Sequence, residues 1–249
     1  MSSSIILHIA LGAAAGGLIN GLAGFGTALF ALGFFLTVMP PEQAVAIVVV
    51  MSVVTGLQGM WIVRNSILDN PRRLSRFLSP SLIGIPIGVA ILTVIDAGTL
   101  KLVIAGFLIL YGGYFSFRRN LPKFERPTPF VDMVVGFLGG LLGGAASLSG
   151  ALPTMWCSMR PWPRMETRAV LQPFNVVVLG LTALLLAWRG LYTSETLTML
   201  AIALPIGLVF SQIGITIFKR MSDDLFRRLL IVMTFVSGSV LAVRELGLL

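Results

Sequence analysis

Apolar residues fill most of this chain in long blocks that are separated by short polar stretches. Most blocks contain close to the roughly 20 residues with which an α-helix crosses a bilayer. We identify eight blocks, at residues 5–39, 43–63, 77–95, 99–117, 131–159, 167–188, 195–218 and 225–243. This pattern predicts an all-α, polytopic membrane protein with almost no part outside the bilayer.

Two of the blocks, 5–39 and 131–159, are too long for one ordinary spanning helix. Small residues interrupt each of them, in the stretches NGLAGFGTA (20–28) and GGAASLSGALP (143–153). Glycine and proline are poor residues for the interior of a plain helix. Each stretch therefore predicts a broken helix or a helical hairpin within the membrane.

The composition agrees with a membrane protein. Of the 249 residues, 56% are hydrophobic and 11% are charged, whereas a soluble domain carries about 25% charged residues. The single cysteine, Cys157, excludes an internal disulfide and a cysteine-based metal site. The net charge of +8 is better explained by membrane orientation and anionic lipid than by nucleic acid.

Short motifs recur in the same order in the two halves of the chain. Three pairs of stretches correspond: GGLINGLAGFGTAL (16–29) with GGLLGGAASLSGAL (139–152), IGIPIGVAI (83–91) with IALPIGLVF (202–210), and TLKLVIAGFLILYG (99–112) with LFRRLLIVMTFVSG (225–238). We therefore expect two membrane repeats of about four segments each, 5–118 and 131–243. A basic, proline-rich cytoplasmic linker over 119–130 joins them.

The basic residues indicate how these segments cross the membrane. Fifteen of the 18 lie in four loops: Arg64, Arg72, Arg73 and Arg76; Arg118, Arg119, Lys123 and Arg126; Arg160, Arg164 and Arg168; Lys219, Arg220, Arg227 and Arg228. All four loops share one face only if 131–159 enters the membrane and returns, and the positive-inside rule favours that arrangement. The two repeats are then inverted, a recurrent transporter design. No charge orients the start of the chain, so 5–39 is either a hairpin or one kinked span.

This combination of features resembles the sulfite exporter TauE/SafE family, a group of small anion transporters. The resemblance covers about residues 8–243 and includes a PIG triplet in the third segment of each half, at 86–88 and 205–207. The second break follows the family's Gly-rich-then-Pro pattern at Gly143, Gly144, Gly150 and Pro153, whereas the first has Phe30 where proline is usual. The resemblance implies a multi-pass protein of the cell inner membrane that carries sulfite, sulfonates or related organosulfur anions. It leaves open which anion, in which direction and with which coupling ion.

The two breaks are the candidate anion site. A break frees backbone N–H groups at a helix N-terminus, the helix dipole adds partial positive charge there, and glycine lets the backbone approach a ligand. The candidate binding residues are Asn20, Gly24, Gly26, Thr27, Ser147, Ser149 and Gly150, together with Gln172 and Asn175. Gly136 and Gly140 have the small-xxx-small spacing of helix packing and are expected to pack.

Several further polar residues lie within apolar blocks. Gln172 and Asn175 stand three residues apart on one helix face, and buried amides are often functional, although hydrogen bonding between helices is the alternative. For Gln58 and Gln212 that alternative is the stronger one. Arg168 either attracts anions at the cytoplasmic mouth or anchors its helix at the membrane surface, and the anchor is the simpler interpretation.

The absence of certain residues also narrows the function. No Asp or Glu lies at the centre of a block, which argues against a cation carrier. We expect alternating-access transport of a small anion with no enzymatic activity and no cofactor, membrane lipid as a partner, no nucleic acid, and a homo-oligomer as an open question. Two alternatives remain. One is a structural or lipid-handling protein packed through glycines; the other is a serine hydrolase using Ser149, for which His8 is the only histidine that could act as base.

Overall fold

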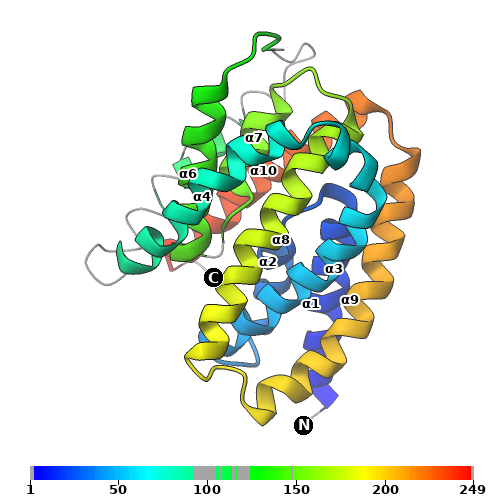
Figure 1. Cartoon of the computed structure of the whole chain (residues 1–249). Helices are drawn as coiled ribbons and strands as arrows, with labels where there is room; N and C mark the ends of the chain where they lie inside the picture. The colour runs from blue at the N-terminus through cyan, green and yellow to red at the C-terminus, as the bar shows by residue number, and fades with distance from the viewer. Residues whose placement is uncertain are drawn as a thin grey trace.

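The computed structural model describes residues 3–91, 124–146 and 148–247, and positions 102, 105–106, 108–110, 112–113 and 116. The described residues form helices and short connections (Figure 1). The helices are α1 (Ser3–Ala23), α2 (Thr27–Phe35), α3 (Pro41–Asp69), α4 (Pro71–Ile91), α6 (Pro129–Ala146), α7 (Ala151–Ser158), α8 (Arg164–Trp188), α9 (Ser194–Arg220) and α10 (Asp223–Glu245). Much of the expected segment 99–117, much of the linker and Ser147 lie outside the described residues.

Four of these helices are long and apolar enough to cross a membrane: α1, the Gln43–Asp69 part of α3, α8 and α9. The all-helical fold expected from the hydropathy pattern is confirmed.

The starts of the helices follow local sequence rules. Pro41, Pro71 and Pro129 each occupy a first helical position, where proline's missing N–H costs nothing. The hydroxyl of Thr193 accepts a hydrogen bond from the N–H of Thr196 and caps α9.

Both long blocks are broken where the small residues predict it. Residues 24–26 separate α1 from α2, and the described residues 148–150 precede α7 after α6 has ended at Ala146. α2 folds back along α1 and packs closely on it, so that a Cβ added at Gly16 would lie 3.0 Å from Cγ2 of Thr27. α7 folds back along α6 in the same way, and a Cβ added at Gly139 would lie 2.9 Å from Cγ of Pro153.

Two glycine seams hold helices from different halves of the sequence together. α1 packs parallel to α9, with Gly17 against the backbone of Gly207 and Gly21 against the backbone of Ser211. Figure 1 shows these two helices side by side along one flank. The matching seam joins α6 to α4. There Gly136, Gly140 and Gly144 press on the backbone of Phe77, Ser81 and Ile85, respectively. The packing role expected for Gly136 and Gly140 is confirmed.

The buried apolar side chains form two main clusters, and each surrounds one broken pair. One cluster lies among α1, α2, α3 and the start of α9 and includes Phe35 and Ile47. The other joins α4, α6, α7 and α8 to the end of α9 and to α10, and includes Phe77, Phe174 and Phe218. α3 and α8 pack along each other between the two clusters.

The described parts of the four basic loops lie at one end of the molecule, which we call the basic end. Arg73 pairs with Glu166, and the backbone N–H of Arg164 donates to Oδ1 of Asp223 at 3.0 Å. The opposite end holds the connection after α2 and the connection between α8 and α9, where Nε2 of Gln43 donates to Oγ1 of Thr196 at 3.3 Å. α1 enters the bundle from this opposite end, whereas α6 enters from the basic end.

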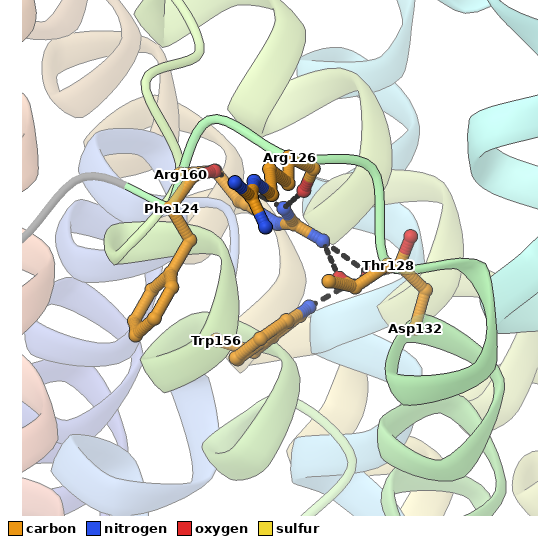
Figure 2. A network of polar contacts seen from close by, with 6 residues as sticks. All are labelled: Phe124, Arg126, Thr128, Asp132, Trp156 and Arg160. Atoms are coloured by element: carbon orange, nitrogen blue, oxygen red, sulfur yellow. Dashed lines mark hydrogen bonds and ion pairs between the residues drawn. The ribbon is translucent and has the colours of Figure 1, made fainter.

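A buried arginine fixes the base of the α6–α7 pair at the basic end (Figure 2). Nη2 of Arg160 lies 3.0 Å from Oδ1 of Asp132, and the same oxygen accepts a hydrogen bond from Nε1 of Trp156 at 2.7 Å. The guanidinium also donates to Oγ1 of Thr128 and to the backbone oxygen of Arg126, the latter at 2.7 Å. This paired charge ties the end of α7, the start of α6 and the described end of the linker into one unit.

Candidate anion site

A cavity of about 40 Å³ lies between the two breaks. This exceeds the roughly 10–15 Å³ that one water molecule requires. The lining residues are Asn20, Phe25, Gly26, Thr27, Ala28, Leu29, Ser52, Leu108, Leu148, Ser149, Gly150, Ala151, Asn175 and Leu179. Six of the nine candidate binding residues are among them, so the structure gathers both breaks and the α8 amide around one space.

The first break presents the N-terminus of α2 to this cavity. Gly26 is the N-cap residue, at φ 92°, and no side chain caps the helix. The N–H groups of Thr27 and Ala28 have no partner among the described residues. Oγ1 of Thr27 is buried and likewise lacks a described partner. An uncapped helix N-terminus beside an unpaired hydroxyl forms a set of donors with partial positive charge, which suits an anion.

The second break reaches the cavity through Ser149 and Gly150, just before α7. The Ser149 hydroxyl donates to Oδ1 of Asn175 at 2.7 Å. Nδ2 of the same Asn175 donates to the backbone oxygen of Gly24 at 3.0 Å. One amide side chain of α8 therefore connects the second break to the first.

Asn20 is held against α3 by residues that sequence analysis did not single out. Its Nδ2 donates to Oγ1 of Thr55 at 2.6 Å and to the backbone oxygen of Ser52 at 3.2 Å. Ser52 also lines the cavity. The available signal was a pair of small polar residues, three positions apart, in the otherwise apolar block 43–63.

Gln172 and Arg168 lie behind the cavity wall rather than in it. Nε2 of Gln172 donates to Oδ1 of Asn20 at 3.4 Å, and Nε of Arg168 donates to Oε1 of Gln172 at 3.1 Å. The Arg168 side chain is 0% exposed and its guanidinium stacks over Phe218, 4.3 Å from the ring centroid. The interpretation of Arg168 as a surface anchor is wrong, because the guanidinium lies inside the helix bundle instead of reaching the membrane surface.

The remaining candidates do not line the cavity. Gln212 is exposed on α9. Gln58 lies on α3, and its Oε1 is buried without a described partner. Gly24 does not line the cavity, but its carbonyl oxygen accepts the hydrogen bond from Asn175. Ser147 lies outside the described residues.

The geometry does not support the hydrolase alternative. The Ser149 hydroxyl is bound to an amide oxygen, which is not a general base. His8 lies near the start of α1, where its Nδ1 is 2.8 Å from the backbone oxygen of Ser4. His8 is thus separated from the end of α1, which lies beside the cavity, by about 22 Å along the helix axis. No group of three or more His, Cys, Asp or Glu side chains that could hold a metal occurs in the described part of the chain.

Comparison with known proteins supplies the family. The model of the family described as "Sulfite exporter TauE/SafE" matches residues 8–241. The "Probable sulfite/organosulfonate exporter TauE" of Cupriavidus necator is 28% identical over 130 residues, which are 51% of this chain and 51% of that protein. The aligned part thus spans about half the length of this curated relative. No solved structure matches the chain. Because the family model covers nearly all of the sequence, this protein belongs to the sulfite exporter TauE/SafE family.

Proposed function

We propose that this protein is a secondary transporter that moves sulfite or a small organosulfonate across the cell inner membrane. Membership of the family and the printed name of the C. necator relative support this class of substrate. The observation that carries the proposal is the cavity between the two breaks. There the uncapped N-terminus of α2 and the unpaired Thr27 hydroxyl face the same space as Ser149 and Gly150.

The chemistry of the lining suits a small oxyanion. None of the described lining residues carries a negative charge, and the polar groups are hydroxyls, amides and backbone N–H groups. Such donors stabilise the oxygens of an anion without a charged side chain in direct contact. Glycine at position 150 lets the second break approach the first closely, because a Cβ there would lie 2.9 Å from Cβ of Phe25.

We further propose that each broken pair is a membrane hairpin and that the two repeats are inverted. The basic end is then cytoplasmic, in agreement with the positive-inside rule. The entry of α1–α2 and of α6–α7 from opposite ends of the bundle supports this arrangement. The two seams support it as well, since the first helix of each half packs on the helix of the other half's third segment: α1 on α9, and α6 on α4.

The seams also suggest which parts move together during alternating access. Backbone lies against backbone in the α1–α9 and α4–α6 seams, and each seam joins the two halves of the sequence. Both seams would therefore have to separate if one half rocked against the other. We propose that α1–α2 moves with α9 and that α6–α7 moves with α4. The cavity then opens alternately along the boundary between these two bodies, where α3 packs on α8.

Sulfite flux into proteoliposomes tests the proposal, with Thr27→Val as the informative variant. Valine matches the shape of threonine but removes the unpaired hydroxyl, so we expect affinity for sulfite to fall about ten- to hundredfold. Thr234→Val is the matched control. Its hydroxyl is buried but donates within α10, to the backbone oxygen of Leu230 at 2.8 Å. Absence of flux of sulfite and of methanesulfonate in the folded wild-type protein would overturn the proposal.

A further inference from the structure

Polar side chains follow one face of α8 from the basic end to the cavity. They are Arg164, Arg168, Gln172 and Asn175, at intervals of four, four and three residues, which places them on one face of the helix. Arg164 is partly exposed at the basic end, where its Nη2 donates to the backbone oxygen of Lys219 at 3.1 Å. Asn175 lines the cavity. The stripe therefore leads from the cytoplasmic surface, in the proposed orientation, to the proposed site.

The second residue of the stripe, Arg168, is a buried charge with no described carboxylate in ion-pair contact. Arg160 gives the comparison, because it is equally buried and has Asp132 at 3.0 Å (Figure 2). Arg168 instead donates to the backbone oxygens of Leu22 and Asn20, at 3.4 and 3.5 Å. Buried charges are normally paired, and these two hydrogen bonds are longer than usual.

The guanidinium of Arg168 also fills the space where four helices converge. It contacts the end of α1, stacks on Phe218 of α9 and hydrogen-bonds Gln172 within α8. On α3, a Cβ added at Gly59 would lie 2.9 Å from its Nη2. The side chain therefore lies between the basic end and the cavity, packed among these four helices.

We propose that Arg168 is the charge-selecting residue of a route along the stripe. In the present conformation its guanidinium holds the C-terminal carbonyls of α1 and closes the way to the cavity. An anion that enters from the basic end replaces those carbonyls, because a guanidinium binds the oxygens of an oxyanion through two parallel hydrogen bonds and gains the ion pair that it lacks. Gln172 and Asn20 then pass the anion to the cavity. This inference rests on the proposed function.

The test compares Arg168→Gln, Arg168→Lys and a control, Arg72→Gln, in proteoliposomes of known orientation. Initial rates of sulfite transport from the basic side give KM and kcat separately. Loss of the charge in Arg168→Gln should raise KM about ten- to hundredfold. Arg168→Lys should recover part of that loss, because it keeps the charge without the planar fork. Arg72 is exposed at the same end, so Arg72→Gln removes one charge without touching the stripe and should leave KM unchanged.

An unchanged KM in folded Arg168→Gln would overturn the inference and leave the proposed function standing. Equal KM values for the Lys and Gln variants, with lower thermal stability in both, would also overturn it, since this result describes a structural contact. If Arg168→Gln does not fold, Arg168→Lys decides alone: a raised KM at wild-type thermal stability supports the inference, and a wild-type KM contradicts it. Absence of sulfite flux in the wild-type protein would overturn both proposals.

Discussion

The two breaks in this chain reach the same cavity by different means. The first turns at Gly24 and Gly26, whose φ angles of 85° and 92° lie in the left-handed region that favours glycine. The second places Gly150 at φ −82°, which any residue adopts. There the requirement is space, because a Cβ at Gly150 would lie 2.9 Å from Cβ of Phe25 and 3.1 Å from Nδ2 of Asn175.

The donors of the two breaks differ as well. The Thr27 hydroxyl in the first break has no described partner, whereas the Ser149 hydroxyl in the second is bound to Asn175. Similar stretches of small residues thus provide a left-handed glycine turn with a free donor in one half, and a tight approach with an occupied donor in the other. We infer that the first break contributes more to anion affinity and the second more to the position of Asn175.

Asn175 is the residue that connects the two breaks, so its loss should have the largest effect. Asn175→Leu leaves the carbonyl of Gly24 without its amide donor and the hydroxyl of Ser149 without its acceptor. Each unpaired buried group costs about 1–3 kcal/mol. We expect transport of sulfite to be lost and the thermal unfolding temperature to fall. Thr182→Val on the same helix is the control, because its hydroxyl bonds only to the backbone oxygen of Val178. Wild-type transport in Asn175→Leu would show that the breaks act independently.

Substitutions of Gly26 and Gly150 separate conformation from space. At Gly26 a Cβ would meet only Cγ2 of Ile19, at 3.1 Å, so the main obstacle is the positive φ. A non-glycine residue there costs about 1–2 kcal/mol, and asparagine tolerates this conformation best. We therefore expect Gly26→Asn to be more stable than Gly26→Ala. At Gly150 the order should reverse, because size decides. Thermal unfolding of the four variants measures both orders, and the same order at both positions would contradict the distinction.

The two hydroxyls should differ when each is removed. Ser149→Ala deletes one hydrogen bond within the protein, which contributes about 0.5–1.5 kcal/mol to stability. We expect its affinity for sulfite to change less than that of Thr27→Val, whose hydroxyl is free for the anion. Titration of sulfite by calorimetry gives both dissociation constants. A larger loss for Ser149→Ala would mean that its hydroxyl turns from Asn175 to the ligand.

Labelling tests the opposite orientation of the two breaks through substitutions that lie outside both. In a Cys157→Ser background, single cysteines would be placed at Thr37, after the first break, and at Trp162, after the second. An impermeant thiol reagent outside the cell should label position 37 and leave position 162 unlabelled until the membrane is permeabilised. Transport activity of both variants serves as the control for correct folding. Labelling of both positions from outside would remove the basis for inverted repeats.

Much of the fold was evident in the sequence. Hydropathy gave the helices, and the small residues within 5–39 and 131–159 placed both breaks. The spacing of Gly136 and Gly140 predicted a packing seam, and the distribution of arginines predicted which loops would meet. These features are local or compositional: a break follows from the residues in it, and basic residues gather where a membrane leaves them in water.

The partners of each helix were decided only by the tertiary structure. An apolar block is hydrophobic on every side, so its periodicity does not show which face meets which neighbour. The pattern therefore does not show that α1 packs on α9 and α4 on α6. Ser52 and Thr55 stand out as small polar residues in block 43–63, but nothing in the pattern shows that they hold Asn20. The same holds for Arg168. As a basic residue near a helix start it resembles a surface anchor, and its place beside the cavity depends on the ends of α1, α3 and α9 closing around it.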